Sequence, residues 1–284
     1  MVRKDTEPIT EAHLIINGAC QFRCSFCWGA PHWMGGELSS LDWLLTGILL
    51  RKMGITNIVL TGGEPLIRPD IVDIATHLFM SNYRVTLSTN AMLLRQRESI
   101  LQYIHEIGIP IDGPTEEVTS RVRPGPRGAL HAAINALELV GNHYPLIETT
   151  IRTVLVPQNR DYLPEIAENI VSRYPECRWK IYQPTRIGYA VPNWQSLEVG
   201  NKDFDEATSA LTREFPNLHV ITQHASDQQG NYLLIGPDGE VYGIDSGLNK
   251  ISAGNLLSTG LENMVYAMAG LIHLPDTKDE LMQR

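Results

Sequence analysis

The first strand-like segment, Ala12-His-Leu-Ile-Ile16, runs within four residues into Cys20-Gln-Phe-Arg-Cys24-Ser-Phe-Cys27. Three cysteines in so short a loop can bind one metal centre through their thiolates. A cluster of four irons held by three cysteines leaves one iron open to a small molecule, whereas a structural site with four cysteine ligands does not. The loop therefore predicts reactive chemistry at the end of a strand.

Along the rest of the chain, apolar runs of strand length alternate with amphipathic runs of helix length, as in a parallel sheet of βα units. The predicted α/β fold has six such repeats, with strands at 12–16, 57–60, 84–87, 107–111, 148–155 and 179–183. Three helices are predicted at 39–53, 69–81 and 162–174. After residue 190 the sequence predicts a loop at 191–194, a helix at 204–214, a strand at 218–222 and a β-hairpin around Pro237-Asp-Gly239.

Composition limits the classes of function. The 284 residues are 43% hydrophobic and 19% charged, as in an ordinary soluble protein. A net charge of -9 disfavours binding to nucleic acid or anionic lipid, and apolar stretches such as 43–50 are too short to span a bilayer. The clustered cysteines suit a reducing compartment, and the isolated Cys177 is interpreted as an inert thiol. We therefore expect a cytoplasmic protein that binds neither nucleic acid nor membrane.

The noteworthy polar residues follow the carboxyl ends of the predicted strands. In a βα barrel these ends share one rim, which is where such enzymes place catalysis. The segments are Thr61-Gly-Gly-Glu-Pro65, Ser88-Thr-Asn90, Asp112-Gly-Pro114 and the pair Tyr182 and Gln183.

The two glycines Gly62 and Gly63 leave the backbone bare after a strand. A ligand can therefore approach main-chain donors and acceptors closely, and Glu64 adds a carboxylate beside them. The same sequence would be an ordinary turn elsewhere, but here it follows a cysteine loop by one βα unit. The combination favours a ligand site.

Two other readings of the cysteine loop stay open. His32 lies five residues beyond Cys27, so a zinc site with three cysteines and one histidine is possible, although such sites usually draw paired cysteines from two segments. A non-enzymatic iron-sulfur electron carrier or sensor is the second alternative. A carrier prefers four protein ligands and has no need of Gly62-Gly-Glu-Pro65.

The chain resembles the radical S-adenosylmethionine (SAM) enzymes. Their hallmark is Cys-x3-Cys-x-aromatic-Cys followed by Gly-Gly-Glu-Pro after the second strand, and both motifs stand intact here, with Phe26 at the aromatic position. The resemblance covers roughly residues 10–190. It implies a partial (βα)6 TIM-like barrel over that range. Residues 191–284 would then form a C-terminal α+β cap with the β-hairpin.

The resemblance also implies a set of site residues. Cys20, Cys24 and Cys27 would hold a [4Fe-4S] cluster whose open iron binds SAM, and reductive cleavage of SAM would give a 5′-deoxyadenosyl radical that abstracts hydrogen from the substrate. The residues expected near SAM are Phe26, Gly62, Gly63, Glu64, Pro65, Ser88, Asn90 and Arg152. The expected substrate contacts are Asp112, Tyr182 and Gln183.

Substrate and partners are bounded less tightly. The hairpin resembles the one that opens the auxiliary-cluster region of peptide-modifying members, but no cysteine follows Cys177, so no second cluster is expected. We expect a small-molecule or peptide substrate in a biosynthetic or modification pathway, with an electron donor such as flavodoxin or ferredoxin. The segment Trp179-Lys-Ile-Tyr-Gln183 is similar to one in viperin-like enzymes, which makes a nucleotide-modifying enzyme the runner-up.

Overall fold

One curved sheet of ten strands organises the computed structural model, which describes residues 9–29, 37–228, 233–244 and 250–259. The strand order is β10-β9-β8-β1-β2-β3-β4-β5-β6-β7, and among these neighbours only the pairs β8-β9 and β9-β10 are antiparallel. The strands are β1 (Glu11–Ile15), β2 (Asn57–Thr61), β3 (Arg84–Ser88), β4 (Glu106–Pro110), β5 (Glu148–Val154), β6 (Arg178–Tyr182), β7 (Val220–Gln223), β8 (Leu233–Ile235), β9 (Glu240–Ile244) and β10 (Lys250–Asn255).

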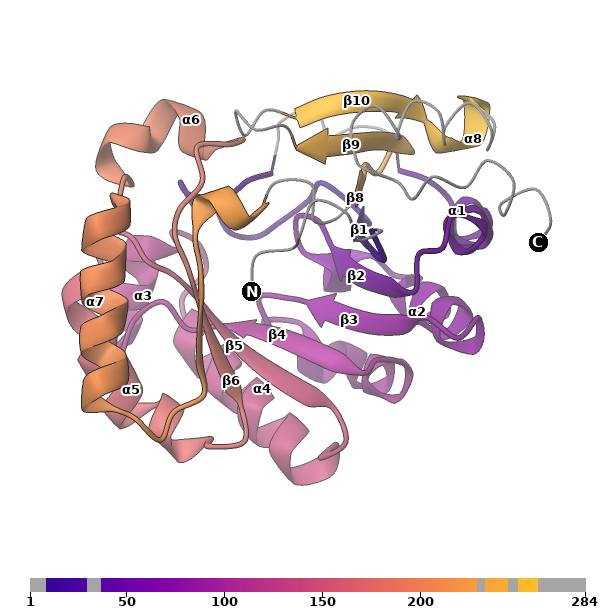
Figure 1. Cartoon of the computed structure of the whole chain (residues 1–284). Helices are drawn as coiled ribbons and strands as arrows, with labels where there is room; N and C mark the ends of the chain where they lie inside the picture. Colours follow the sequence, from indigo (N-terminus) through magenta and orange to yellow (C-terminus); the bar gives the residue numbers. More distant parts are fainter. Residues whose placement is uncertain (1–8, 30–36, 229–232, 245–249, 260–284) are drawn as a thin grey trace.

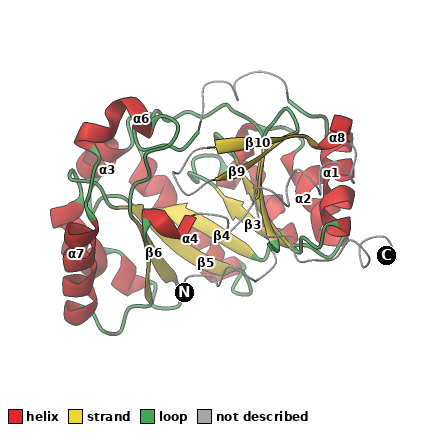
Figure 2. Cartoon of the chain, turned by 45° about the horizontal axis from the view of Figure 1, so that its top comes forward, coloured by secondary structure: helices red, strands yellow, loops and turns green. Residues whose placement is uncertain are grey.

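Most of the helices lie on the convex side of this sheet, outside the ring that it describes (Figures 1 and 2). These are α1 (Ser40–Lys52), α2 (Ile71–Met80), α3 (Glu116–Val122), α4 (Ala129–His143), α5 (Leu163–Asn169) and α7 (Asn201–Glu214). Two short helices, α6 (Ala190–Asn193) and α8 (Leu256–Thr259), lie at the top of Figure 1. The concave side of the sheet is called the lumen below. The arrangement is the partial α/β barrel that the sequence predicts.

Alternation along the strands decides which side chains face the helices and which face the lumen. On β1, Ala12 and Leu14 are fully buried in the core shared with the helices, so Glu11 and His13 point the other way. On β6 the buried Trp179 and Ile181 face the helices, which turns Lys180 and Tyr182 toward the lumen. A polar lumen inside an apolar shell is the result.

The start of α1 shows how local sequence fixes an element. The Ser39 hydroxyl accepts a hydrogen bond from the backbone N–H of Asp42 at 3.2 Å, and the Asp42 carboxylate accepts one from the Ser39 N–H at 2.9 Å. This reciprocal capping box satisfies two donors that the first helical turn would leave unpaired. The predicted start of the helix at residues 39 and 40 is confirmed.

Most predicted elements are found within two residues of their expected positions, with two differences. Residues 190–193 form the short helix α6 where a loop was predicted. The helix predicted at 162–174 is instead α5 followed by a separate 3-10 turn at Val171–Arg173, because Ile170 leaves helical geometry at φ -123 and ψ -66.

The predicted hairpin is present as β8 and β9, but its place was not anticipated. β8 pairs in parallel with β1, so the hairpin lengthens the main sheet. At the opposite end β7 pairs in parallel with β6. The division into a barrel at 10–190 and an extension at 191–284 stays a prediction, and both segments contribute strands to the one sheet.

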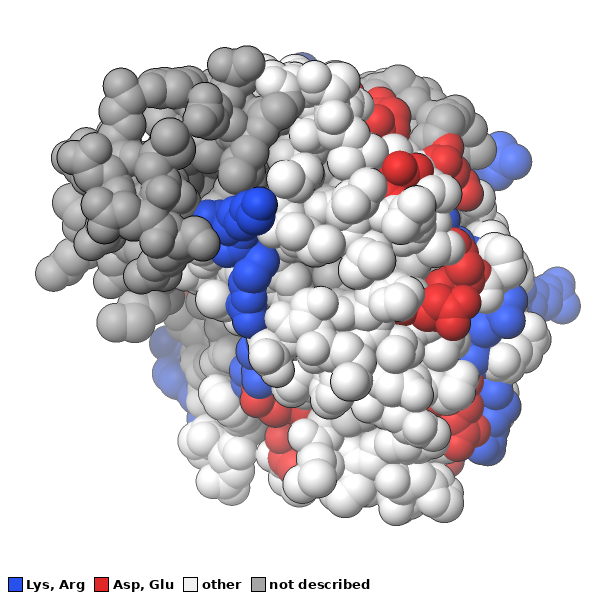
Figure 3. Space-filling view, turned by 90° about the vertical axis from the view of Figure 1, so that its right-hand side faces the viewer, with Lys and Arg blue, Asp and Glu red and all other residues white. Residues whose placement is uncertain are grey.

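The surface shows one further property. Figure 3 presents the face on which α1 and α2 lie: some of its basic side chains form a narrow column on the left, others alternate with acidic ones along the right edge, and the centre is largely uncharged. Within the described ranges no helix has the length and apolarity needed to cross a membrane. The prediction that nucleic acid is not bound stays a prediction.

Candidate active site

The three cysteines lie in the loop that follows β1, at the rim predicted from the sequence. Backbone N–H groups point at two of the sulfurs: Phe22 N–H donates to Cys20 Sγ at 3.4 Å, and Gly29 N–H donates to Cys27 Sγ at 3.4 Å. Donors of this kind stabilise thiolates and tune iron-sulfur clusters. Burial raises the pKa of the Cys24 thiol to about 12, so this residue would release a proton when a metal binds.

The Gly62-Gly63 turn packs directly on the backbone that precedes the cysteines. Gly63 N–H donates to the Asn17 carbonyl at 2.9 Å, and Glu64 N–H donates to the Ala19 carbonyl at 2.7 Å. A Cβ on Gly63 would lie 2.1 Å from the Ala19 carbonyl oxygen, and one on Gly62, whose φ is +139, would lie 2.4 Å from that of Asn17. The glycines are therefore required so that the two loops can touch.

The Glu64 carboxylate joins the ends of two strands. It is 1% exposed and accepts hydrogen bonds from Leu66 N–H at 3.0 Å, the Thr89 hydroxyl at 2.6 Å and Asn90 N–H at 2.7 Å. Burial raises its pKa to about 7, although these three bonds lower it. Pro65 starts the 3-10 turn that Glu64 caps. Glu64 therefore holds the turn after β2 against the residues after β3.

Asn90 reaches from the end of β3 to the cysteine loop. Its side-chain amide donates to the side-chain oxygen Oε1 of Gln21 at 3.0 Å and lies 3.9 Å from Cys20 Sγ. The structure thus brings Asn90, Glu64 and the cysteine loop together, as expected for parts of one site.

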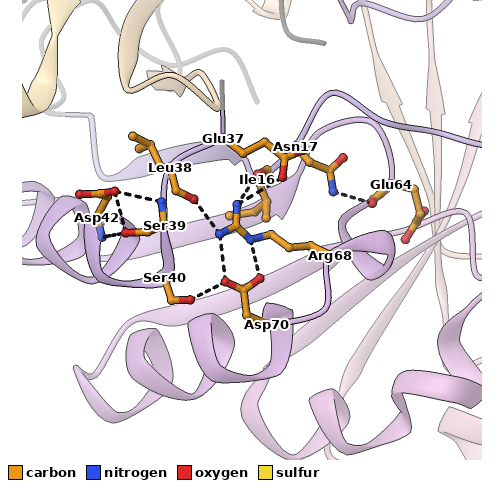
Figure 4. A network of polar contacts seen from close by, with 10 residues as sticks. All are labelled: Ile16, Asn17, Glu37, Leu38, Ser39, Ser40, Asp42, Glu64, Arg68 and Asp70. Atoms are coloured by element: carbon orange, nitrogen blue, oxygen red, sulfur yellow. Dashed lines mark hydrogen bonds and ion pairs between the residues drawn. The ribbon is translucent and has the colours of Figure 1, made fainter. Parts of the chain in front are cut away.

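A second network of polar contacts joins the end of β1, the residues before α1 and the residues before α2 (Figure 4). The buried Arg68 donates to the Ile16 carbonyl at 3.2 Å and to the Leu38 carbonyl at 2.7 Å, and it pairs with Asp70 at 2.6 Å. Asn17 donates its side-chain amide to the Glu64 carbonyl at 3.0 Å. Sequence reasoning missed both residues, because neither belongs to a recognisable motif.

Arg152 faces the lumen from β5. Its Nη1 donates to the Ser88 hydroxyl at 2.9 Å, and its guanidinium fills the space left by Gly108, where a Cβ would lie 2.1 Å from Cζ. The buried Nε has no hydrogen-bond partner among the described residues. Buried donors usually have a partner, so this N–H is available to an acceptor on a bound ligand.

Two predicted substrate residues form hydrogen bonds within the fold. Asp112 is fully buried, and its carboxylate accepts from Val154 N–H at 2.9 Å and from the Arg123 guanidinium. Gln183 is 6% exposed. Its Nε2 donates to the Val199 carbonyl and to Asn201 Oδ1, and its Oε1 accepts from Ala225 N–H. The polar atoms of both side chains are engaged within the fold, and their contact with substrate stays a prediction.

Tyr182 does face the lumen, and it contacts a residue to which the sequence assigned no role. Lys180 Nζ lies 5.0 Å from the centre of the Tyr182 ring. Lys180 and Arg152 are register partners on adjacent strands, so the two cations stand side by side. The alternation of Trp179, Lys180 and Ile181 was the signal that could have placed Lys180 in the lumen.

An ion-pair ring closes the lumen below these cations. Its members are the first residues of four consecutive strands, and the distances are 2.6 Å for Arg84 to Glu148, 3.0 Å for Arg178 to Glu106 and 3.1 Å for Arg178 to Glu148. The ring carries two positive and two negative charges, so it is neutral as a unit.

Across the lumen from Lys180 and Arg152 stands one carboxylate, Glu11 of β1. Burial alone would raise its pKa, but His13, Lys180 and Arg152 lower it. Arg152 Nη2 also lies 3.9 Å from Glu106 of the ion-pair ring. With that ring counted as neutral, two cations and one carboxylate leave the lumen a positive balance, although the whole chain has a net charge of -9.

Comparison with known proteins agrees with this geometry. The model of the radical SAM superfamily matches residues 14–170, more than half of the 284-residue chain. The chain belongs to the radical SAM superfamily. Members use a [4Fe-4S] cluster and SAM, and the residues described above fit them: three cysteines, two of which have backbone N–H donors on their sulfurs, beside a turn that only glycine can form.

Two curated relatives are each named a probable GTP 3′,8-cyclase. The protein of Saccharolobus solfataricus is 37% identical over 101 residues, which are 34% of this chain and 32% of the relative. That of Pyrobaculum aerophilum is 28% identical over 127 residues, which are 43% of this chain and 41% of the relative. The match thus spans less than half the length of these relatives.

Solved structures show the same fold at low sequence identity. Streptococcus suis SuiB bound to the precursor peptide SuiA superposes with a TM-score of 0.71 at 15% identity, covering 89% of this chain and 64% of SuiB. The structure described as native anSMEcpe with bound AdoMet and a Kp18Cys peptide gives 0.69 at 14% identity, covering 94% and 83%. These likenesses confirm the partial barrel.

Proposed function

We propose that this enzyme reductively cleaves SAM and abstracts hydrogen from a small anionic substrate held in the lumen. Cys20, Cys24 and Cys27 hold the [4Fe-4S] cluster. When bound, the two cofactors supply a 5′-deoxyadenosyl radical, and the protein orients the reactants and excludes water. Flavodoxin or ferredoxin is the proposed class of electron donor.

One observation carries the proposal: the Gly62-Gly63 turn and the cysteine loop form a single unit through two backbone hydrogen bonds. The carbonyl oxygens of Gly62 and Gly63 accept no hydrogen bond within the described ranges, so they are free to accept from an ammonium group. An amino acid bound to an open iron beside the cysteines would place its amino group at this turn.

The orphaned Nε of Arg152 supports a place for a carboxylate or ribose oxygen of SAM. Replacing Arg152 with Ala is expected to weaken SAM binding by about 1.5 to 3 kcal/mol, because a charge-assisted hydrogen bond is lost. Equilibrium binding to the anaerobic holoenzyme measures this. The matched control is Arg160→Ala, since Arg160 pairs with Asp161 on the surface. Equal affinities for SAM in the two variants would show that Arg152 does not bind SAM and has a structural role.

Lys180 supports an anionic substrate. Among the described residues no carboxylate forms an ion pair with it, and it stands beside Arg152 in a lumen of positive balance. Phosphate and carboxylate groups satisfy such cations. The names of the two GTP cyclase relatives support a nucleotide as the first class to test.

The substrate class can be tested with GTP and guanosine as paired probes. Binding of GTP to the holoenzyme is expected to be at least about tenfold tighter than binding of guanosine, and Lys180→Gln is expected to reduce that difference by a similar factor. Lys202→Gln, on the exposed face of α7, is the control. Equal affinity for the two probes in the parent enzyme would exclude triphosphate recognition.

The decisive experiment on the reaction class is metal analysis and product analysis of anaerobically reconstituted protein. We expect iron near four equivalents and release of 5′-deoxyadenosine when a reductant and SAM are added. One equivalent of zinc without iron would support the zinc alternative; His32, its proposed fourth ligand, lies outside the described residues. A cluster whose spectrum is unchanged by SAM would support the electron carrier.

A further inference from the structure

The segment that follows α3 is built against the cysteine loop. Pro124 accepts a hydrogen bond from Arg23 N–H at 2.8 Å, and a Cβ on Gly125 would lie 2.5 Å from the Phe22 ring. Arg123 directly precedes these two residues, so their contacts place it next to the cysteine loop.

The Arg123 side chain makes three contacts there. Its Nη1 donates to Cys24 Sγ at 3.8 Å, its Cζ lies 5.0 Å above the Phe26 ring, and its Nε donates to Asp112. The side chain of Arg123 is 17% exposed and that of Asp112 is 0% exposed. Among the described residues, Arg123 is the cationic side chain that donates to a cysteine sulfur of the loop.

Asp112 cannot turn away from this contact, because Val154 N–H holds its other carboxylate oxygen and Asn159 donates to its carbonyl at 3.0 Å. The ion pair is thus an oriented dipole whose positive end lies against Cys24. An arginine guanidinium keeps its charge in proteins, and the buried Asp112 carboxylate pairs with it.

We propose that Arg123 is a positioning residue that raises the reduction potential of the cluster through Cys24. The inference rests on the proposed role of Cys24 as a cluster ligand. One electron from an external reductant adds negative charge to the cluster and its sulfurs, and a fixed cation that donates to a ligand sulfur stabilises the reduced state more than the oxidised one. Asp112 supplies the orientation and keeps the buried guanidinium paired.

The test is a potentiometric titration of the anaerobic holoenzyme, followed by the electron paramagnetic resonance of the reduced cluster. In Arg123→Gln the ratio of reduced to oxidised cluster, at the midpoint potential of the parent enzyme, is expected to fall about tenfold, which is a shift of about 59 mV for one electron. Arg123→Lys keeps the charge but cannot bridge Asp112 and Cys24 with a planar guanidinium. Its midpoint potential should lie between those of the parent enzyme and Arg123→Gln.

The matched control is Arg121→Gln, which removes a cation from the exposed side of the same helix, where Arg121 pairs with Glu117 at 2.9 Å. Its midpoint should equal that of the parent. If Arg123→Gln carries full iron and its cluster has the same midpoint potential as that of Arg121→Gln, the inference is overturned. If Arg123→Gln fails to retain iron, an unchanged midpoint in Arg123→Lys overturns it. Iron content and deoxyadenosine release of the parent enzyme test the proposed function separately.

Discussion

Cys24→Ala is expected to abolish both the visible absorbance of the cluster and the release of 5′-deoxyadenosine. Changes to residues around metal ligands already cost about 10-fold to 100-fold in metal affinity, and the loss of a ligand costs more. Cys24 is also the cysteine that Arg123 contacts, so its removal leaves a buried guanidinium beside an empty position. Iron analysis, absorbance and product quantification after anaerobic reconstitution measure the effect.

Cys177→Ala is the control for this experiment. Cys177 is 4% exposed, and burial raises its pKa to about 12, as expected for an inert thiol in the core. Its replacement should leave iron content and turnover at the level of the parent enzyme. Cleavage of SAM by Cys24→Ala at the rate of Cys177→Ala would refute the assignment of the cysteine loop.

Gly63→Ala has the second large expected effect. The added methyl group would meet the Ala19 carbonyl, which belongs to the backbone and cannot rotate away as a side chain could. The turn and the cysteine loop must separate, which breaks the two backbone hydrogen bonds between them. We expect the free energy of unfolding to fall by about 1 to 3 kcal/mol and deoxyadenosine release to fall with it.

Gly141→Ala in α4 is the matched control, since its new Cβ would find no atom nearer than 3.9 Å. It should be neutral or stabilising by about 0.5 to 1 kcal/mol, as for glycine in a helix interior. Denaturant unfolding of both variants gives the comparison. A Gly63→Ala protein as stable and as active as Gly141→Ala would show that the close packing of the two loops is not required.

The sequence predicts those parts of this molecule that depend on periodicity and on residues close together in the chain. β2 is a nearly continuous apolar run and β5 is rich in β-branched residues, and the cysteine loop and the Gly62-Gly63 turn each lie within a few residues. Their common rim then follows from the geometry of parallel strands.

Contacts between distant residues could not be predicted in the same way. Asp112 was expected to meet substrate because it follows a strand end, but Arg123 comes back from the end of α3 and engages it. Gln183 is predicted to contact substrate because it follows the end of β6. Its side-chain amide instead donates to Val199 and Asn201, which lie just before and at the start of α7. In both cases the partner lies one helix away in the chain, and no local pattern encodes that return.

The two strands at the ends of the described sheet differ from those in its middle. β7 has only four residues, and the register of β10 against β9 shifts between Ser252 and Gly254. A short strand and an irregular one are poor templates for the backbone of a second molecule. The open sheet is therefore protected against growth by edge-to-edge aggregation at high protein concentration, without the closure that a complete barrel uses for the same purpose.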